Sequence, residues 1–320
     1  MNDRRMPAEW ENPARIMLAL PGQHTDWAYI LEEAADQYDR LLRSLESAGE
    51  RVLLLDGDFP YNDTWTRDYG PLSVIDGGRM LELDFGFNGW GLKFAADKDN
   101  LVNLRMAEQG LRNEGAYRNH RDFILEGGSI ESDGKGTILT TSRCLCSPNR
   151  NGGKSKDEIT RILHSLLGAE RVLWVDHGFL AGDDTDSHID TLARLAPCDT
   201  ILYVMPPEDK NDVHFAELSA MEQQLKGFRT AGGSPFRLVG LPFPDAIYDE
   251  DGMRLPATYA NYLVTGKNVF VPVYNQPEKD RRAVEAIGGV FPSHCVHTVD
   301  CRTLIRQHGS LHCSTMQLYY

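Results

Sequence analysis

The chain has 320 residues, of which 41% are hydrophobic and 25% are charged. Those proportions are typical of a globular protein, so they exclude a fibrous or largely disordered chain. With 33 Lys and Arg against 47 Asp and Glu, the net charge is −14. A field of that sign repels phosphate backbones and anionic lipids, so we expect no nucleic-acid or membrane partner and favour a cationic small molecule.

The sequence predicts an intracellular setting. Its opening residues lack the apolar stretch of a secretory leader, and no later window reaches the length of a membrane span. We therefore expect a cytoplasmic protein, with a homodimer as the assembly considered because twofold dimers are the most common soluble oligomers. Six cysteines are too few for a disulfide framework in a chain this long, so we expect reduced thiols at Cys144, Cys146, Cys198, Cys295, Cys301 and Cys313.

A helix followed by a strand recurs along the chain. The spacing of apolar residues, with glycines after each helix, predicts three such pairs: 26–48 with 50–56, 155–167 with 170–176, and 277–287 with 296–300. Two strand–turn–strand segments are predicted over 123–141 and 259–275. Their turns, Asp133-Gly134 and Gly266-Lys267, contain residues that tight hairpins require for a positive φ.

Unusual loop chemistry divides the chain into five units of comparable length. The markers are 52 to 73 residues apart and are Asp68, Glu126, His188, Asn261 and Cys313. Five such units around one axis would form an α/β fold resembling a small five-bladed propeller, whose loops converge at one end. Because no linker-like or low-complexity run interrupts the chain, we expect a single domain over 1–320.

Cys313 and His188 are the first candidates for catalysis. Cys313 lies in GSLHCSTMQ among polar neighbours, although a buried inert thiol is the alternative. A thiol with a pKa of about 8.5 needs a nearby cation or base before it can act as a nucleophile. If the segment is a strand, the side chain of His312 points away from that of Cys313.

His188 lies in the acidic loop GDDTDSHID. Carboxylates around an imidazole favour its protonated form and can orient it for general acid/base work. The alternatives are a solvated acidic loop or a calcium or magnesium loop, but the spacing of an EF-hand is absent. The surrounding carboxylates are Asp183, Asp184, Asp186 and Asp190.

Two further carboxylates complete a candidate site. Asp68 lies in NDTWTRDYGP, where a structural ion pair with Arg67 is the alternative, and Glu126 opens EGGS. The two glycines after Glu126 allow the backbone to approach a ligand closely. A thiol, an imidazole and the carboxylates of Asp68, Glu126 and Asp190 suit a planar cation, because carboxylates grip a guanidinium through charge-assisted hydrogen bonds.

Seven segments carry a family resemblance that runs from residue 6 to residue 317. They are MPAEW at 6–10, TWTRDYGP at 64–71, FNGWG at 87–91, EGGSIESDG at 126–134, PNRN at 148–151, DDTDSHID at 183–190 and LHCSTMQ at 311–317. In this order they resemble the agmatine deiminase and bacterial (Porphyromonas-type) peptidylarginine deiminase family of the pentein superfamily. The resemblance implies a five-bladed α/β-propeller of ββαβ-type repeats that hydrolyses a guanidine to a urea and ammonia, with no metal or organic cofactor.

The resemblance also implies a role for each matching residue. Cys313 would be the nucleophile and His188 the general acid/base, while Asp68 and Asp190 clamp the guanidinium and Glu126 adds a carboxylate beside it. The remaining substrate contacts would be Trp90, lining the channel, and Asp184 and Asp186, at a distal amine. The implied reaction converts agmatine to N-carbamoylputrescine and ammonia, on the way from arginine to putrescine, through a covalent thiouronium on the cysteine.

Three alternatives stay open. The segment before the nucleophile reads RQHGS, whereas agmatine enzymes are glycine-rich there. Peptidyl arginine, free arginine or another guanidine therefore remains an alternative substrate, giving a citrulline-type product. The other two are a non-catalytic pentein binding protein and a metal-binding protein that uses His188 with the aspartates of its loop.

Overall fold

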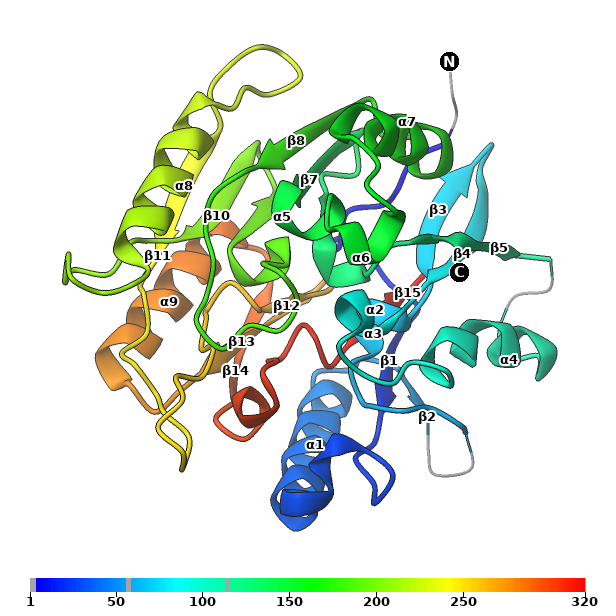
Figure 1. Cartoon of the computed structure of the whole chain (residues 1–320), viewed down its shortest axis with the longest axis horizontal. Helices are drawn as coiled ribbons and strands as arrows, with labels where there is room; N and C mark the ends of the chain where they lie inside the picture. The colour runs from blue at the N-terminus through cyan, green and yellow to red at the C-terminus, as the bar shows by residue number, and fades with distance from the viewer. Residues whose placement is uncertain (1–3, 56–58, 113–114, 320) are drawn as a thin grey trace.

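The computed structural model describes residues 4–55, 59–112 and 115–319, so the last residue of the predicted strand 50–56 lies outside the described residues. The described strands form five sheets of three strands each. In Figure 1 the long helices lie at the outside of the molecule, and short helices and loops occupy its middle.

Four of the sheets are built in the same way. The first strand pairs antiparallel with the second, a helix follows on the outside, and the third strand returns parallel to the second. The first of these units consists of β3 (Leu72–Asp76), β4 (Arg79–Gly86), α4 (Val102–Glu108) and β5 (Tyr117–Ile124), and the second consists of β6 (Ile130–Ser132), β7 (Thr137–Thr141), α7 (Lys156–Leu167) and β8 (Arg171–Val175). The third unit consists of β9 (Ala193–Ala196), β10 (Thr200–Val204), α8 (Phe215–Gly227) and β11 (Arg237–Leu241). The fourth consists of β12 (Leu263–Val264), β13 (Asn268–Val273), α9 (Pro277–Val290) and β14 (Cys295–Asp300).

The fifth sheet joins the two ends of the chain. Its central strand β1 (Arg15–Ala19) runs antiparallel to β15 (Met316–Leu318) and parallel to β2 (Val52–Leu55), with α1 (Leu31–Ser47) between β1 and β2. The order β15, β1, α1, β2 repeats the pattern of the other four sheets across the chain ends. The predicted α/β fold of five ββαβ units is thereby confirmed.

The first two predicted helices form, although residues 26–30 are a 3₁₀ turn before α1. The helix α1 buries Tyr38, Leu41 and Leu45, which share one face at helical spacing. The helix α7 begins with a capping box between Ser155 and Glu158 and ends at Gly168, whose φ is +71°.

The predicted end of the third helix was wrong. The helix α9 continues through Gly288-Gly289 to Val290. Burial of Ile287 and Val290 against the sheets explains the extra turn, since core packing outweighs the poor helix propensity of glycine.

The predicted hairpins differ from the structure in two details. Gly134 has a positive φ of +73°, as its turn requires, but Gly266 does not adopt that region. Gly266 is needed for room instead, because a Cβ there would collide with the side chain of Asn12. Residues 123–124 belong to β5, so the first hairpin begins at β6.

Each sheet begins at a strand that directly follows one of the five sequence markers. Asp68 is in α2 (Thr66–Tyr69) before β3, and Glu126 precedes a 3₁₀ turn (Gly127–Ser129) before β6. His188 precedes the 3₁₀ turn Ile189–Thr191 before β9, whereas Asn261 and Cys313 come just before β12 and β15. The fivefold repeat therefore brings the markers to one end of the molecule. Three short helices complete this end: α3 (Gly89–Leu92), α5 (Ser142–Leu145) and α6 (Pro148–Asn151).

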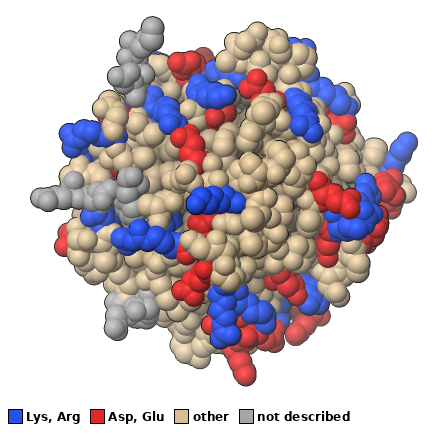
Figure 2. All heavy atoms as spheres, turned by 180° about the vertical axis from the view of Figure 1, so that it is seen from behind, with Lys and Arg blue, Asp and Glu red and all other residues tan. Residues whose placement is uncertain are grey.

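The buried apolar side chains form one cluster with contributions from all five sheets. On the face shown in Figure 2, acidic and basic side chains are intermixed over the atoms that are described. Among the described helices, none is both long and apolar enough to cross a membrane.

Candidate active site

Residues from four of the five repeats surround one point at the converging end. His188 Nδ1 lies 3.6 Å from Asp68 Oδ1, and His188 Nε2 lies 3.8 Å from Glu126 Oε2. Cys313 precedes β15 of the fifth sheet, and its Sγ lies 3.8 Å from Asp190 Oδ2. The five side chains predicted to act together are therefore within a few ångströms of one another, and all five are buried.

A cavity that is open to solvent lies over this cluster. Asp68, Trp90 and Cys313 contribute to its lining, whereas the fully buried His188 and Glu126 lie behind that lining. The lining carries further acidic side chains, which are Asp26, Asp63, Asp183 and Asp184, and burial raises the pKa of Asp63 to about 7. A cation entering from solvent meets carboxylates along the way.

Asp68 is held by two neutral donors. Trp90 Nε1 donates to Oδ2 at 2.8 Å, and the Gly128 amide donates to Oδ1 at 3.0 Å. Trp90 adopts this position with φ +54°, a strained conformation for a residue with a bulky side chain. Burial, with the Asp190 and Glu126 charges, raises the pKa of Asp68 to about 6, although nearby His188 acts in the opposite direction.

Gly128 leaves open the space between the charged groups. A Cβ at this residue would lie 2.7 Å from His188 Nδ1, 2.8 Å from Asp68 Oδ1 and 3.0 Å from Asp190 Oδ2. Any side chain here would occupy the place where three polar groups converge.

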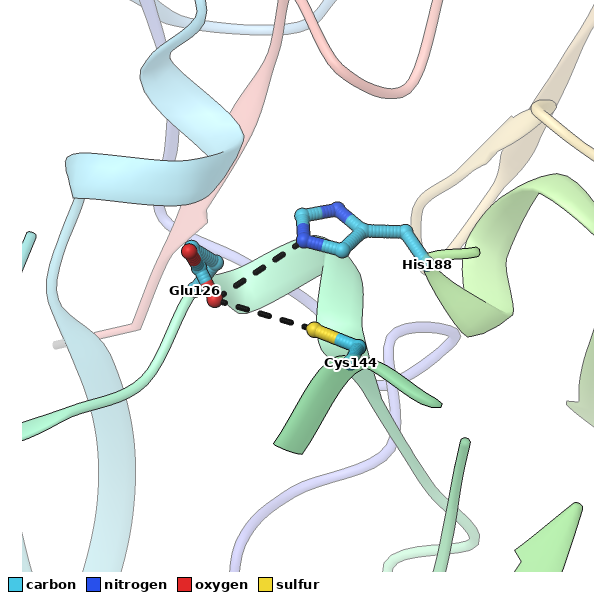
Figure 3. A group of neighbouring side chains, drawn as sticks. All are labelled: Glu126, Cys144 and His188. Atoms are coloured by element: carbon cyan, nitrogen blue, oxygen red, sulfur yellow. Dashed lines mark hydrogen bonds and ion pairs between the residues drawn. The ribbon is translucent and has the colours of Figure 1, made fainter. Parts of the chain in front are cut away.

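His188 faces carboxylates from two directions. Figure 3 shows that Glu126 contacts both the His188 ring and Cys144, whose Sγ lies 3.9 Å from Glu126 Oε2. Burial opposes protonation of the ring, but Asp68, Cys144 and Glu126 outweigh burial and raise the pKa of His188 well above its ordinary value. Both ring nitrogens lack a hydrogen-bond partner among the described residues. A charged imidazolium with free N–H groups can donate a proton to a bound molecule.

Arg150 holds Glu126 on its other side. Its Nε lies 2.9 Å from Oε1 and 3.0 Å from Oε2, and both side chains are fully buried. Burial opposes ionisation of Glu126, but Arg150 and His188 outweigh it and lower the pKa of that carboxyl. Glu126 is therefore an anion fixed against the imidazole.

Cys313 lies at the cavity wall beside Asp190. Asn261 organises this side, because its Oδ1 accepts from the Cys313 amide at 3.2 Å and its Nδ2 donates to Asp190 Oδ2 at 3.1 Å. Asp190 Oδ1 is buried and has no hydrogen-bond partner among the described residues. Burial, with the Asp190 and Asp68 charges, raises the pKa of the Cys313 thiol well above its ordinary value. A cation bound between these carboxylates would reverse that electrostatic effect and favour the thiolate.

The aspartates of the acidic loop before His188 have different contacts. Asp183 caps its own loop by accepting from the amides of Thr185 and Ser187 at 3.1 and 2.7 Å. Asp186 pairs with Lys93 and Arg150 at 2.8 and 2.7 Å, so its charge is already balanced. Asp184 lines the cavity and lies 3.7 Å from His308 Nδ1.

Two sets of side chains have the donor atoms of a metal site. Glu126, Cys144 and His188 form one, and the other consists of Glu9, Glu131 and His312. Each set already has an arginine on a carboxylate: Arg150 on Glu126, and Arg194 on both Glu9 and Glu131. A guanidinium in that position repels a metal cation and satisfies the charge it would bind. The aspartates of the His188 loop do not face one common point, because Asp183 and Asp186 have the separate partners described above.

Sequence reasoning missed three contributors to this site. Arg150 lies in the PNRN segment and Glu9 in the MPAEW segment. Both segments contributed to the family resemblance, but the sequence indicated no function for either residue. Cys144, taken as a structural thiol, contacts Glu126. The suggested Asp68–Arg67 ion pair is absent from the described contacts, since Arg67 pairs with Glu9 at 2.7 Å.

His312 also differs from its expectation. The residues around Cys313 form a turn and not a strand, and His312 Nδ1 lies 2.7 Å from Asp190 Oδ2. The ring therefore points away from the cavity but toward a site residue. All six cysteines are free thiols, as predicted.

Comparison with known proteins places the chain in a family. The model of the Porphyromonas-type peptidyl-arginine deiminase family matches residues 5–318. The agmatine deiminase of Pseudomonas aeruginosa is 30% identical over 98% of this chain and 95% of its own. A solved Porphyromonas gingivalis protein called "Putative Arginine Deiminase" is 45% identical, with a TM-score of 0.92 and coverage of 98% of both chains.

A structure of C. jejuni agmatine deiminase with substrate bound is 36% identical, with a TM-score of 0.92, and covers 99% of this chain and 96% of its own. These matches span the five repeats and every residue of the cluster. The chain therefore belongs to the Porphyromonas-type peptidyl-arginine deiminase family, which includes agmatine deiminases.

Proposed function

We propose that this protein is an agmatine deiminase, which hydrolyses agmatine to N-carbamoylputrescine and ammonia with Cys313 as nucleophile. The observation that carries the proposal is the meeting of a thiol, a charged imidazole and carboxylates around a cavity. Asp190 Oδ1 and the His188 nitrogens are buried there without partners among the described residues. Buried polar atoms without partners are costly, and a guanidinium with its five N–H donors satisfies such carboxylate oxygens.

The charge of the cavity favours agmatine among guanidine compounds. Among the described residues its lining includes five aspartates, and His308 is the only residue of that lining with a basic side chain. Agmatine has a second cation at its far end, whereas free arginine and a C-terminal arginine carry a carboxylate. An anion near these aspartates is repelled, and an ammonium is attracted. Asp184 lines the cavity and is the candidate contact for the distal ammonium of agmatine. Asp186 is already paired with Lys93 and Arg150.

Substrate binding would activate the nucleophile. Asp68 and Asp190 grip the guanidinium from opposite sides, and Trp90 packs at the cavity wall. The bound cation and the His188 imidazolium offset the carboxylates that keep Cys313 protonated, so the thiolate forms when substrate is present.

The thiolate then adds to the guanidinium carbon. His188 donates a proton to one amino nitrogen, which leaves as ammonia, because an amide anion is a very poor leaving group. The C–N bond breaks and a thiouronium remains on Cys313. His188 next takes a proton from water, the resulting hydroxide adds to the same carbon, and the C–S bond breaks. The ureido product departs, and Glu126 stabilises the imidazolium in both steps.

Two features of the wider setting belong to this proposal. N-carbamoylputrescine lies on the way to putrescine, so the enzyme acts in polyamine metabolism. A cytoplasmic location follows from a substrate that is made from arginine inside cells, and the homodimer stays a prediction.

A peptidylarginine deiminase is the second candidate, favoured by the description of the family, which names peptidyl-arginine deiminase. A panel of agmatine, free arginine and a peptide with C-terminal arginine separates the two, with ammonia and ureido product measured for each. We expect kcat/KM for agmatine to exceed the other values at least 100-fold. A higher kcat/KM for the peptide would show that peptidyl arginine, and not agmatine, is the substrate. Inactivity on every guanidine would favour a non-catalytic binding protein.

A further inference from the structure

Asp190 is the member of the clamp whose orientation depends most on other side chains. Its Oδ2 is contacted by His312 Nδ1 at 2.7 Å, by Asn261 Nδ2 at 3.1 Å and by Cys313 Sγ at 3.8 Å. Its Oδ1 has no partner among the described residues. All these contacts fall on Oδ2, the oxygen that also faces the space beside Gly128, 3.0 Å from a Cβ placed there, so they fix which oxygen faces that space.

His312 connects Asp190 to a second carboxylate. While Nδ1 faces Asp190, Nε2 lies 2.8 and 2.9 Å from the two oxygens of Glu9 and 3.1 Å from Arg194 Nη2. The ring is fully buried, so it cannot exchange these partners for water. Burial opposes ionisation of Asp190, but His312 outweighs it and lowers the pKa of that carboxyl. Because an ionised carboxylate accepts only, Nδ1 must carry the hydrogen that joins them.

Glu9 fixes the far side of the ring. Arg67 Nη1 and Arg194 Nη2 donate to Glu9 at 2.7 and 2.6 Å. Arg67 directly precedes Asp68, and its amide donates to the Cys313 carbonyl at 3.2 Å. The N-terminal segment therefore connects both halves of the clamp and the nucleophile from beneath.

We propose that His312, held by Glu9, is a positioning residue that orients Asp190 so that Oδ2 faces the guanidinium in the space beside Gly128. This inference rests on the proposed function and goes beyond the residues that touch substrate. In this proposal the two ring nitrogens of His312 have different roles. The hydrogen bond at Nδ1 orients Asp190, and the contact of Nε2 with Glu9 anchors the ring.

The test uses two substitutions that keep one ring position each. The amide nitrogen of His312→Asn lies near the place of Nδ1, and that of His312→Gln lies near the place of Nε2. We expect His312→Asn to keep agmatine KM within about tenfold of wild type, because a hydrogen bond to Asp190 can still form. We expect His312→Gln to raise KM about 10- to 100-fold with a smaller change in kcat, the range of a lost charge-assisted hydrogen bond. His164→Asn, on the outer face of α7, is the matched control and should match wild type.

A structural role alone would give a different pattern. Thermal unfolding of each variant shows whether the fold persists, and adding His312→Gln to Asp190→Asn tests coupling. If His312 acts through Asp190, the second substitution adds less than threefold in KM to the first. Equal KM values for the two His312 variants, or fully additive effects, would overturn the inference.

Calorimetry with agmatine in a Cys313→Ala background gives the same comparison without turnover. Should the wild-type protein bind agmatine but release no ammonia, the proposed function fails and the Kd values alone decide the role of His312. Should the wild-type protein not bind agmatine, both proposals are wrong.

Discussion

The Nε of Arg150 donates to both carboxylate oxygens of Glu126, at 2.9 and 3.0 Å, inside a region from which solvent is excluded. The other nitrogens of Arg150 bind Asp186 at 2.7 Å and the Thr185 carbonyl at 2.8 Å. This one guanidinium therefore fixes the carboxylate behind His188 and also ties down the loop that leads to it.

Arg150→Met should destabilise the protein strongly. The substitution leaves the buried Glu126 charge without its partner, and breaking a buried pair in this way costs about 3–5 kcal/mol. Urea unfolding measures the loss. Arg302→Met is the control, since its pair with Asp300 is exposed and should contribute less than about 1 kcal/mol. A loss for Arg150→Met no greater than that of the control would show that Glu126 does not depend on Arg150.

Gly128→Ala should abolish deimination while the protein stays folded. The added methyl group enters the space between His188, Asp68 and Asp190, where the guanidinium is proposed to bind. Gly289→Ala in α9 is the matched change, because a Cβ there has no neighbour within 4 Å. We expect less than 1% of wild-type kcat/KM for the first variant and full activity for the second. Activity of Gly128→Ala above 10% would place the substrate elsewhere.

The raised pKa of Asp68 predicts an acid limb in the activity profile. Below a pH of about 6 the Asp68 carboxyl is protonated, so it has no negative charge to attract the guanidinium. We therefore expect kcat/KM to fall with decreasing pH. Asp68→Asn should lower kcat/KM at least 100-fold and remove this limb from the remaining activity. The measurement is kcat/KM for agmatine between pH 5 and 8, at about unit steps. A profile that is flat across pH 6 would contradict the role of Asp68.

Cys144→Ala separates the two thiols of the site. Cys144 contacts Glu126 but does not line the cavity, so it cannot reach a substrate there. We expect kcat within tenfold of wild type, with a loss of stability of about 1 kcal/mol for the buried atom removed. Ammonia release and thermal unfolding provide both values. If Cys144→Ala is as inactive as Cys313→Ala, the two thiols have been assigned incorrectly.

Much of the fold could be predicted from the sequence because its repeats leave local signals. Apolar spacing located α1 and α7, and the five markers identified the five units. Two local predictions failed where tertiary contacts decide: α9 passes through Gly288-Gly289 because its last residues reach the core, and Gly266 makes room for Asn12.

The catalytic candidates could also be predicted, since a thiol, an imidazole and carboxylates are recognisable by type. Their supporting groups could not. Arg150, Glu9 and His312 act through partners that are 24 to 303 residues distant in sequence. Only the closure of the five repeats brings such residues together, so no local pattern identifies their partners.

The most direct test of the account is to stop agmatine turnover with acid and determine by peptide mass spectrometry where the intermediate is attached. We predict a thiouronium on Cys313, absent from Cys313→Ala, and no modification of Cys144. An adduct on Cys144, or turnover that persists in Cys313→Ala, would contradict the assignment of the nucleophile.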